Sequence, residues 1–229
     1  MIIDGLQKLT LLDFPEKIAC TIFTHGCNFR CPFCHNASLV VSQTNEHISI
    51  DEIKSFLEKR KGVLDGVAIT GGEPMLQKDL KEFIKTVKDY GFLVKLDTNG
   101  CYPEKLEELI DEGLVDYVAV DIKSSPEKYS LVTGVPEFDV TPIKKTVELL
   151  KQGRVEYEFR TTVVKELHEI KDFEEIATWL EGCERYYLQQ FVDSGDIISD
   201  GMTAYDKETM EKIKNVVSEK IPFVELRGV

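Results

Sequence analysis

The sequence has few of the features that mark secreted or membrane proteins. Six cysteines in 229 residues are too few for a disulfide scaffold in a chain of this length. No apolar run approaches the roughly 20 residues that a membrane span needs. Residues 1–5 also lack the basic and then apolar pattern of an export signal. We therefore expect a cytoplasmic protein with no membrane partner.

Basic side chains are scarce as well. The chain holds 28 lysine and arginine residues against 41 aspartate and glutamate residues, which gives a net charge of −13. Such a surplus of negative charge opposes binding to a phosphate backbone, so nucleic acid is not an expected partner. No stretch resembles a linker or a low-complexity tract, and we predict one domain over residues 1–229.

Three of the cysteines stand close together in residues 24–36, which read T-H-G-C-N-F-R-C-P-F-C-H-N. Cys27, Cys31 and Cys34 have CxxxCxxC spacing, and soft thiolates select zinc, copper(I) or an iron–sulfur cluster. A closed zinc site would need a fourth ligand, and His35 adjoins Cys34 too closely to share the same tetrahedral ion. A zinc site with a distant histidine stays as the alternative. The count of three favours a cluster with one iron left open for a small molecule.

Apolar strands and amphipathic helices alternate along the chain. We predict six strands, at residues 17–24, 66–70, 93–97, 117–122, 155–164 and 185–191. We interpret residues 2–15 as a preamble that ends in a turn, and residues 222–226 as a short tail. The clearest helix start is the capping box Ser49-Ile50-Asp51-Glu52, and the last helix is predicted at residues 206–220.

This alternation predicts an α/β fold with parallel strands and right-handed crossovers. Six strand–helix units are fewer than the eight that close a TIM barrel, so we expect a partial (βα)6 barrel. A flavodoxin-like doubly wound sheet is the alternative, because a count of units does not distinguish a curved sheet from a flat one.

Short polar motifs follow three of the predicted strands. Gly71 and Gly72 would let the backbone run close beside a ligand, and Glu73 can accept hydrogen bonds from an ammonium group. The alternative is an ordinary turn between strand and helix. Asp97 and Asp121 end consecutive strands, so their oxygens should lie side by side and gather positive charge, unless both aspartates merely cap loops or helices.

Four motifs in order, at residues 26–36, 71–74, 97–100 and 121–123, resemble the radical S-adenosylmethionine (SAM) enzymes. The residues around these motifs are most similar to those of the activases of glycyl radical enzymes, and the resemblance covers most of the chain. It implies the partial (βα)6 barrel and a [4Fe-4S] cluster on the three clustered cysteines. It also implies reductive cleavage of SAM to a 5′-deoxyadenosyl radical that generates a glycyl radical on a partner enzyme.

The resemblance is closest to the activating proteins of anaerobic ribonucleoside-triphosphate reductase. Pyruvate formate-lyase is the second candidate partner, and flavodoxin or ferredoxin is the implied electron donor. A small-molecule radical SAM enzyme, such as a deazaguanine synthase, is an alternative within the superfamily, and a zinc or electron-carrier module is an alternative outside it. Cys101 and Cys183 are isolated, so a second cluster is not expected.

The resemblance also implies roles for individual residues. Lys123 is expected to pair with the methionine carboxylate of SAM, and Arg160 to reach the same cofactor unless it forms a surface salt bridge. Some relatives have a histidine past the sixth strand, where this chain offers Gln190 or a neighbour. The implied SAM contacts are Gly71, Gly72, Glu73, Asn99, Lys123, Arg160 and Gln190. The implied ligands of a monovalent cation are Asp97, Thr98 and Asp121.

Overall fold

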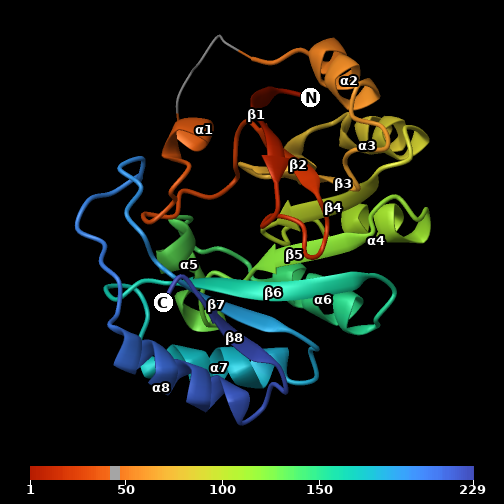
Figure 1. Ribbon diagram of the computed structural model, residues 1–229. Helices are drawn as coiled ribbons and strands as arrows, with labels where there is room; N and C mark the ends of the chain where they lie inside the picture. Colours follow the sequence, from red (N-terminus) through yellow and green to blue (C-terminus); the bar gives the residue numbers. More distant parts are fainter. Residues whose placement is uncertain (42–46) are drawn as a thin grey trace.

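The computed structural model describes residues 1–41 and 47–229, and its strands form one curved sheet (Figure 1). The sheet follows the order of the chain, and β2 to β8 pair in parallel, whereas β1 is antiparallel to β2. The strands are β1 (Ile3–Thr10), β2 (Ala19–Thr24), β3 (Gly66–Gly71), β4 (Leu93–Thr98), β5 (Tyr117–Asp121), β6 (Glu156–Val163), β7 (Tyr186–Gln190) and β8 (Val224–Arg227). The predicted α/β fold with a partial parallel barrel is therefore confirmed, and β2 to β7 are its six predicted strands.

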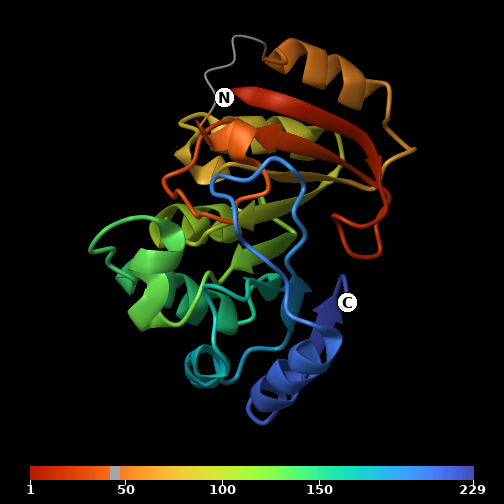
Figure 2. The same ribbon diagram turned by 90° about the vertical axis from the view of Figure 1, so that its left-hand side faces the viewer.

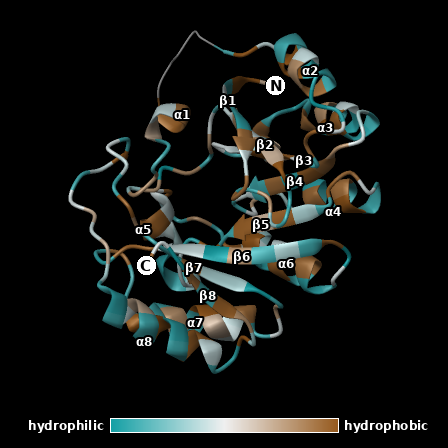
Figure 3. Ribbon diagram, viewed as in Figure 1, coloured by the Kyte–Doolittle hydropathy of each residue, from teal (hydrophilic) through white to brown (hydrophobic). Residues whose placement is uncertain are grey.

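The longer helices lie on the outer side of the sheet, as two views at right angles show (Figures 1 and 2). They are α2 (Ile50–Glu58), α3 (Leu80–Asp89), α4 (Pro103–Asp111), α6 (Thr141–Lys151), α7 (Ile170–Leu180) and α8 (Lys207–Ser218). Hydrophilic residues colour the outer turns of α2 and α8, whereas β3 is largely hydrophobic (Figure 3). Among the described residues, every helix is too short or too polar to cross a bilayer.

The predicted capping box at the start of α2 is confirmed. The Ser49 hydroxyl accepts a hydrogen bond from the Glu52 amide at 3.2 Å, and the Glu52 carboxylate accepts one from the Ser49 amide at 3.0 Å. Each bond satisfies an amide that the first turn of a helix leaves without an intrahelical partner.

The two end segments correct the sequence interpretation. Residues 3–10 form the edge strand β1 instead of a preamble, and the tail contains β8. The buried strand β2 has backbone groups on its outer edge that need partners, and β1 supplies them, with Gly5 opposite Phe23. The apolar residues of β1, Ile3, Leu6 and Leu9, stand three apart and not two, so no alternation marked the strand. β8 in turn pairs with β7, where Leu226 lies beside Leu188.

Two connections carry short elements of their own. The long connection after β5 contains the 3-10 turn η2 (Pro126–Lys128) and α5 (Tyr129–Thr133), and η1 (Pro74–Leu76) follows β3. The short helix α1 (Ala37–Val41) follows the cysteines. The end of α5 supports the cysteine loop, because the Arg30 amide donates to the Thr133 carbonyl at 2.8 Å.

Candidate cofactor site

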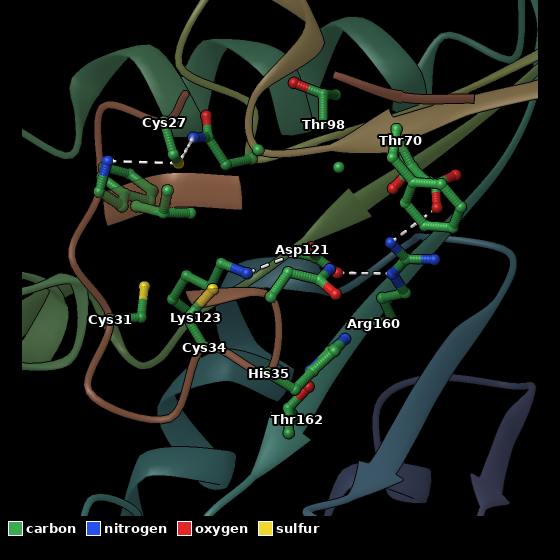
Figure 4. Close-up of a pocket in the computed structure, with 18 of the residues that line it drawn as sticks. Cys27, Cys31, Cys34, His35, Thr70, Thr98, Asp121, Lys123, Arg160 and Thr162 are labelled. Atoms are coloured by element: carbon green, nitrogen blue, oxygen red, sulfur yellow. Dashed lines mark hydrogen bonds and ion pairs between the residues drawn. The ribbon is translucent and has the colours of Figure 1, made fainter. Parts of the chain in front are cut away.

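A cavity of about 320 Å³ lies inside the sheet, at the carboxyl ends of the strands. Small-molecule sites typically measure roughly 300 to 1,000 Å³. Figure 4 shows side chains from the cysteine loop and from several strands pointing into this space. Of the thirteen predicted site residues, eleven line it: Cys27, Cys31, Cys34, Gly71, Gly72, Asp97, Thr98, Asn99, Asp121, Lys123 and Arg160. Glu73 and Gln190 are the two that do not.

The cysteine loop leaves the end of β2 and is anchored by its aromatic residues. Phe29 and Phe33 are buried, so the polar loop is fixed to the core at two points. Burial raises the pKa of Cys31 to about 12, and it also raises the pKa of Cys27. Buried thiols of this kind ionise only beside strong positive charge, such as a bound metal supplies.

The arrangement of donors fits an iron–sulfur cluster better than a single zinc ion. A zinc ion needs its ligands about 2.0–2.3 Å away. Within residues 1–41 and 47–229, no three His, Cys, Asp or Glu side chains gather closely enough for one metal ion. A zinc site would need one distant histidine as its fourth ligand. Two of the histidines that could serve, His25 and His47, both bond to the Asp4 carboxylate, at 2.6 and 2.7 Å. The three cysteines nevertheless face one cavity, as the ligands of a wider cluster would.

The two glycines after β3 allow a close approach of two backbones. A Cβ atom on Gly72 would lie 1.9 Å from the Gly26 carbonyl oxygen, and Gly71 has a φ of +110°. The Gly72 amide donates to the Thr24 carbonyl at 2.9 Å, and the Glu73 amide donates to the Gly26 carbonyl at 2.8 Å. The pair of glycines therefore holds the start of the cysteine loop against β3.

Glu73 is fully buried behind the cavity wall. Its carboxylate accepts hydrogen bonds from the Met75 amide, the Thr98 hydroxyl and the Asn99 amide, at 3.0, 2.9 and 2.7 Å. Burial raises its pKa to about 7, although these bonds work in the opposite direction. Glu73 therefore positions the end of β4, and its contact with an ammonium group stays a prediction.

A hydrogen-bonded chain links that end of β4 to the cysteine loop. The Asn99 side chain donates to the Asn28 side-chain oxygen at 2.8 Å, and Asn28 donates to the Cys101 sulfur at 3.1 Å. Sequence reasoning missed Asn28 and treated Cys101 as isolated. The position of Asn28 directly after Cys27 was the only available signal.

Five charged side chains, on or just past three neighbouring strands, form an ion-pair ladder. The guanidinium of Arg160 bridges Asp97, at 3.0 Å, and Asp121, at 2.5 Å. Lys95 pairs with the other oxygen of Asp97, and Lys123 pairs with the other oxygen of Asp121 at 3.1 Å. Figure 4 shows Asp121 between Lys123 and Arg160. Burial opposes the charge on Asp121, but Arg160 and Lys123 outweigh it and hold the pKa of that carboxyl well below its usual range.

In the ladder, the predicted ligands of the monovalent cation already have partners. The four carboxylate oxygens of Asp97 and Asp121 each face a lysine or arginine nitrogen. The Thr98 hydroxyl donates to Glu73 and accepts from the Gly100 amide at 3.1 Å. These residues therefore do not fit a monovalent metal ion in the arrangement that the structure shows. Sequence reasoning did not find Lys95, which looked like an ordinary strand residue.

At the far end of the site, Gln189 lines the cavity and Gln190 does not. Neighbouring residues of a strand point to opposite faces, and the side-chain amide of Gln190 donates instead to the Tyr205 carbonyl at 2.8 Å. The neighbour of the predicted residue is therefore the one available to a ligand. His35 and Thr162 also line the cavity without having been predicted.

The segment after β7 covers the cysteine loop from outside, and Figure 2 shows it passing beside α1. The Ser199 amide donates to the Pro32 carbonyl at 2.9 Å. The Asp196 carboxylate accepts hydrogen bonds from the Ser38 amide and hydroxyl, the latter at 2.7 Å. These bonds fix both sides of the loop that carries the cysteines.

A family model of the radical SAM superfamily matches residues 21–180, which is more than half of the chain, and the protein belongs to that superfamily. The expectation drawn from the motifs is confirmed, and membership implies a [4Fe-4S] cluster and SAM. Over 212 residues, the chain is 37% identical to "Putative glycyl-radical enzyme activating enzyme MJ1227" of Methanocaldococcus jannaschii, with 90% of this chain and 83% of the relative covered. This match places the chain in the family of glycyl-radical enzyme activating enzymes.

Two further proteins are similar to this chain. The chain is 30% identical over 162 residues to the pyruvate formate-lyase-activating enzyme of Staphylococcus aureus, with 65% of this chain and 63% of the relative covered. The crystal structure of Streptococcus suis SuiB bound to precursor peptide SuiA shares the fold, with a TM-score of 0.72 and 14% identity. That match covers 91% of this chain and 48% of SuiB.

Proposed function

We propose that this protein generates the glycyl radical of a partner enzyme, and that the partner is anaerobic ribonucleoside-triphosphate reductase. Similarity to MJ1227 over 90% of the chain, together with three cysteines facing one cavity, is the observation that supports glycyl radical generation. The choice of partner rests on the resemblance of the motifs alone. When bound, the cluster and SAM supply a 5′-deoxyadenosyl radical that takes a hydrogen atom from the partner's glycine. We propose a flavodoxin or ferredoxin as the electron donor.

The chain itself binds and orients the reactants. Cys27, Cys31 and Cys34 hold the cluster. The Lys123 ammonium has three donor hydrogens, and the bond to Asp121 uses one, so it can still bind the methionine carboxylate of SAM. Gln189 lines the cavity, and we propose it as the polar contact of the nucleoside of SAM.

Exposed leucines near the amino end of β2 favour a protein substrate over a free metabolite. Leu9 at the end of β1, and Leu11 and Leu12 in the turn to β2, are 57%, 68% and 90% exposed. The next residue, Asp13, lines the cavity and accepts a hydrogen bond from Thr21 at 2.5 Å. Apolar residues grouped on a surface are typical of protein contacts. A partner's surface would also help to exclude water from the radical.

The decisive experiment mixes the reduced, cluster-loaded protein and SAM with the anaerobic ribonucleotide reductase of the same organism. We expect a doublet electron paramagnetic resonance signal on a glycine that persists after the activase is removed. Deuterium placed on that glycine should appear in 5′-deoxyadenosine. A reductase with alanine in place of the glycine is the matched control. A signal only with pyruvate formate-lyase would favour the second candidate, and transfer only from a small metabolite would reject the activase proposal.

Lys123→Ala tests the proposed carboxylate contact. A hydrogen bond between charged groups contributes about 1.5–3 kcal/mol, so SAM affinity should fall by about tenfold or more. Equilibrium binding of SAM to the cluster-loaded protein measures this. Lys145→Ala, which removes an exposed ion pair with Glu104, is the control and should leave the affinity unchanged. Equal affinity in both variants would remove Lys123 from the SAM site.

A further inference from the structure

The ion-pair ladder carries more positive than negative charge. Lys95, Arg160 and Lys123 contribute three positive charges, and Asp97 and Asp121 contribute two negative ones. In the parallel register of β5 and β6, Asp121 lies directly opposite Arg160. Lys95 and Asp97 are two residues apart on β4 and therefore project from the same face.

Within the described residues, neighbouring carboxylates do not supply the missing negative charge. Glu158 is a further carboxylate beside the ladder, and its Oε1 lies 4.0 Å from Arg160 Nη1. Both oxygens of Glu158 accept hydrogen bonds from Arg227, each at 2.9 Å, so its charge is already balanced. A further cation at the ladder would meet a net positive charge and carboxylate oxygens that already have partners.

Lys95 occupies the position beside Asp97 where a monovalent cation would bind. Its side chain is 2% exposed, and a lysine is almost never buried so fully unless it is paired. Its ammonium bonds to Asp97 and lies 5.9 Å from the centre of the Tyr117 ring. A monovalent metal ion binds through oxygen ligands, and this ammonium occupies the oxygen that such an ion would need.

We propose that Lys95 and Arg160 replace the monovalent cation that the family resemblance implies, so that SAM binding by this protein requires neither Na⁺ nor K⁺. The net positive charge of the ladder then faces the SAM carboxylate through Lys123. This inference rests on the proposed SAM site.

The first test compares salts on the wild-type protein with its cluster reconstituted under anaerobic conditions. SAM affinity and the thermal midpoint are measured in NaCl, KCl and tetramethylammonium chloride at equal ionic strength. We expect less than a twofold difference in affinity and no saturable change in the midpoint. A saturable gain of tenfold or more in affinity with Na⁺ or K⁺ would overturn the proposal.

The second test creates the missing cation site. Lys95→Met frees one oxygen of Asp97, so the thermal midpoint of this variant should rise saturably with K⁺ or Na⁺ but not with tetramethylammonium. Thallium(I) magnetic resonance, with Tl⁺ as a stand-in for K⁺, should show binding to Lys95→Met and none to wild type. Lys95→Arg keeps the charge and should show neither response. Tl⁺ binding to wild type, or a salt response equal in wild type and Lys95→Met, would count against the proposal.

Two features keep these tests decisive. Should Lys95→Met fail to fold, the double variant Lys95→Met/Asp97→Asn removes both charges together and should fold without responding to the cation. The midpoint and the thallium signal do not depend on turnover. Failure to form a glycyl radical in a salt-independent protein would therefore reject the partner enzyme, whereas salt dependence in an active protein would reject only the ladder.

Discussion

The two sides of the cavity differ in how their polar groups are satisfied. On one side, the thiols of Cys27, Cys31 and Cys34 are held by a loop that is anchored through its aromatic residues, and none of them forms an ion pair within the described residues. On the other side, Asp97 and Asp121 are fully ion-paired. One side therefore presents thiols without charged partners, and the other side already holds the lysine and arginine cations that balance its carboxylates.

The difference follows from the cost of burying each group. A neutral thiol behaves as a small hydrophobic side chain, so a loop can hold three of them near the core at little cost. A buried carboxylate loses several kcal/mol of hydration, and only a charged partner compensates for this loss. Removing one partner of a buried ion pair costs more, because it leaves the other charge buried and unpaired. The acidic side of the site is therefore stable only with its cations in place.

The largest effect is expected from the cysteine side. Cys27→Ala, Cys31→Ala and Cys34→Ala should each abolish the [4Fe-4S] cluster, because each removes a ligand. Iron and sulfide content and the visible absorption after anaerobic reconstitution measure this. Cys101→Ala and Cys183→Ala are the controls and should keep the cluster. Equal loss in the controls would overturn the ligand assignment.

Gly72→Ala should disturb the cysteine side without touching a cysteine. Its Cβ would lie 1.9 Å from the Gly26 carbonyl oxygen, so the loop must move. We expect the free energy of unfolding to fall by about 1–3 kcal/mol, together with less cluster per protein. Gly62→Ala has open space around its Cβ and a φ of +74°, so it should cost stability but leave the cluster content unchanged. Normal cluster content in Gly72→Ala would contradict the close approach.

Glu73 joins the two sides, and its contribution to the free energy of unfolding should depend on pH. Its folded pKa of about 7 lies above the ordinary value of 4.5, so between these values the folded state holds a proton that the unfolded state has lost. The stability that Glu73 contributes therefore falls as the pH rises through this window, by an amount on the order of 3 kcal/mol. Chemical unfolding of wild type and Glu73→Gln across this range measures it. A wild-type advantage that grows with pH would contradict the assignment.

Sequence patterns predicted most of this architecture because they are local. The CxxxCxxC spacing, the paired glycines and the acidic ends of two strands each stand within a few residues, and all of them line the cavity. The edge strands β1 and β8 were missed because their stability comes from pairing with β2 and β7 and not from a pattern of their own.

The sequence alone determined the cysteine motif, the order of the six central strands and the longer helices, and the superfamily. These features depend on covalent spacing and on the period of apolar residues. Only the tertiary structure decided which side chains share a partner. It placed Gln189 in the cavity in place of Gln190, turned Glu73 behind the wall, and brought Lys95 onto Asp97. Ion pairs between strands depend on register and on which face each residue takes, and the spacing of residues along the chain does not encode them.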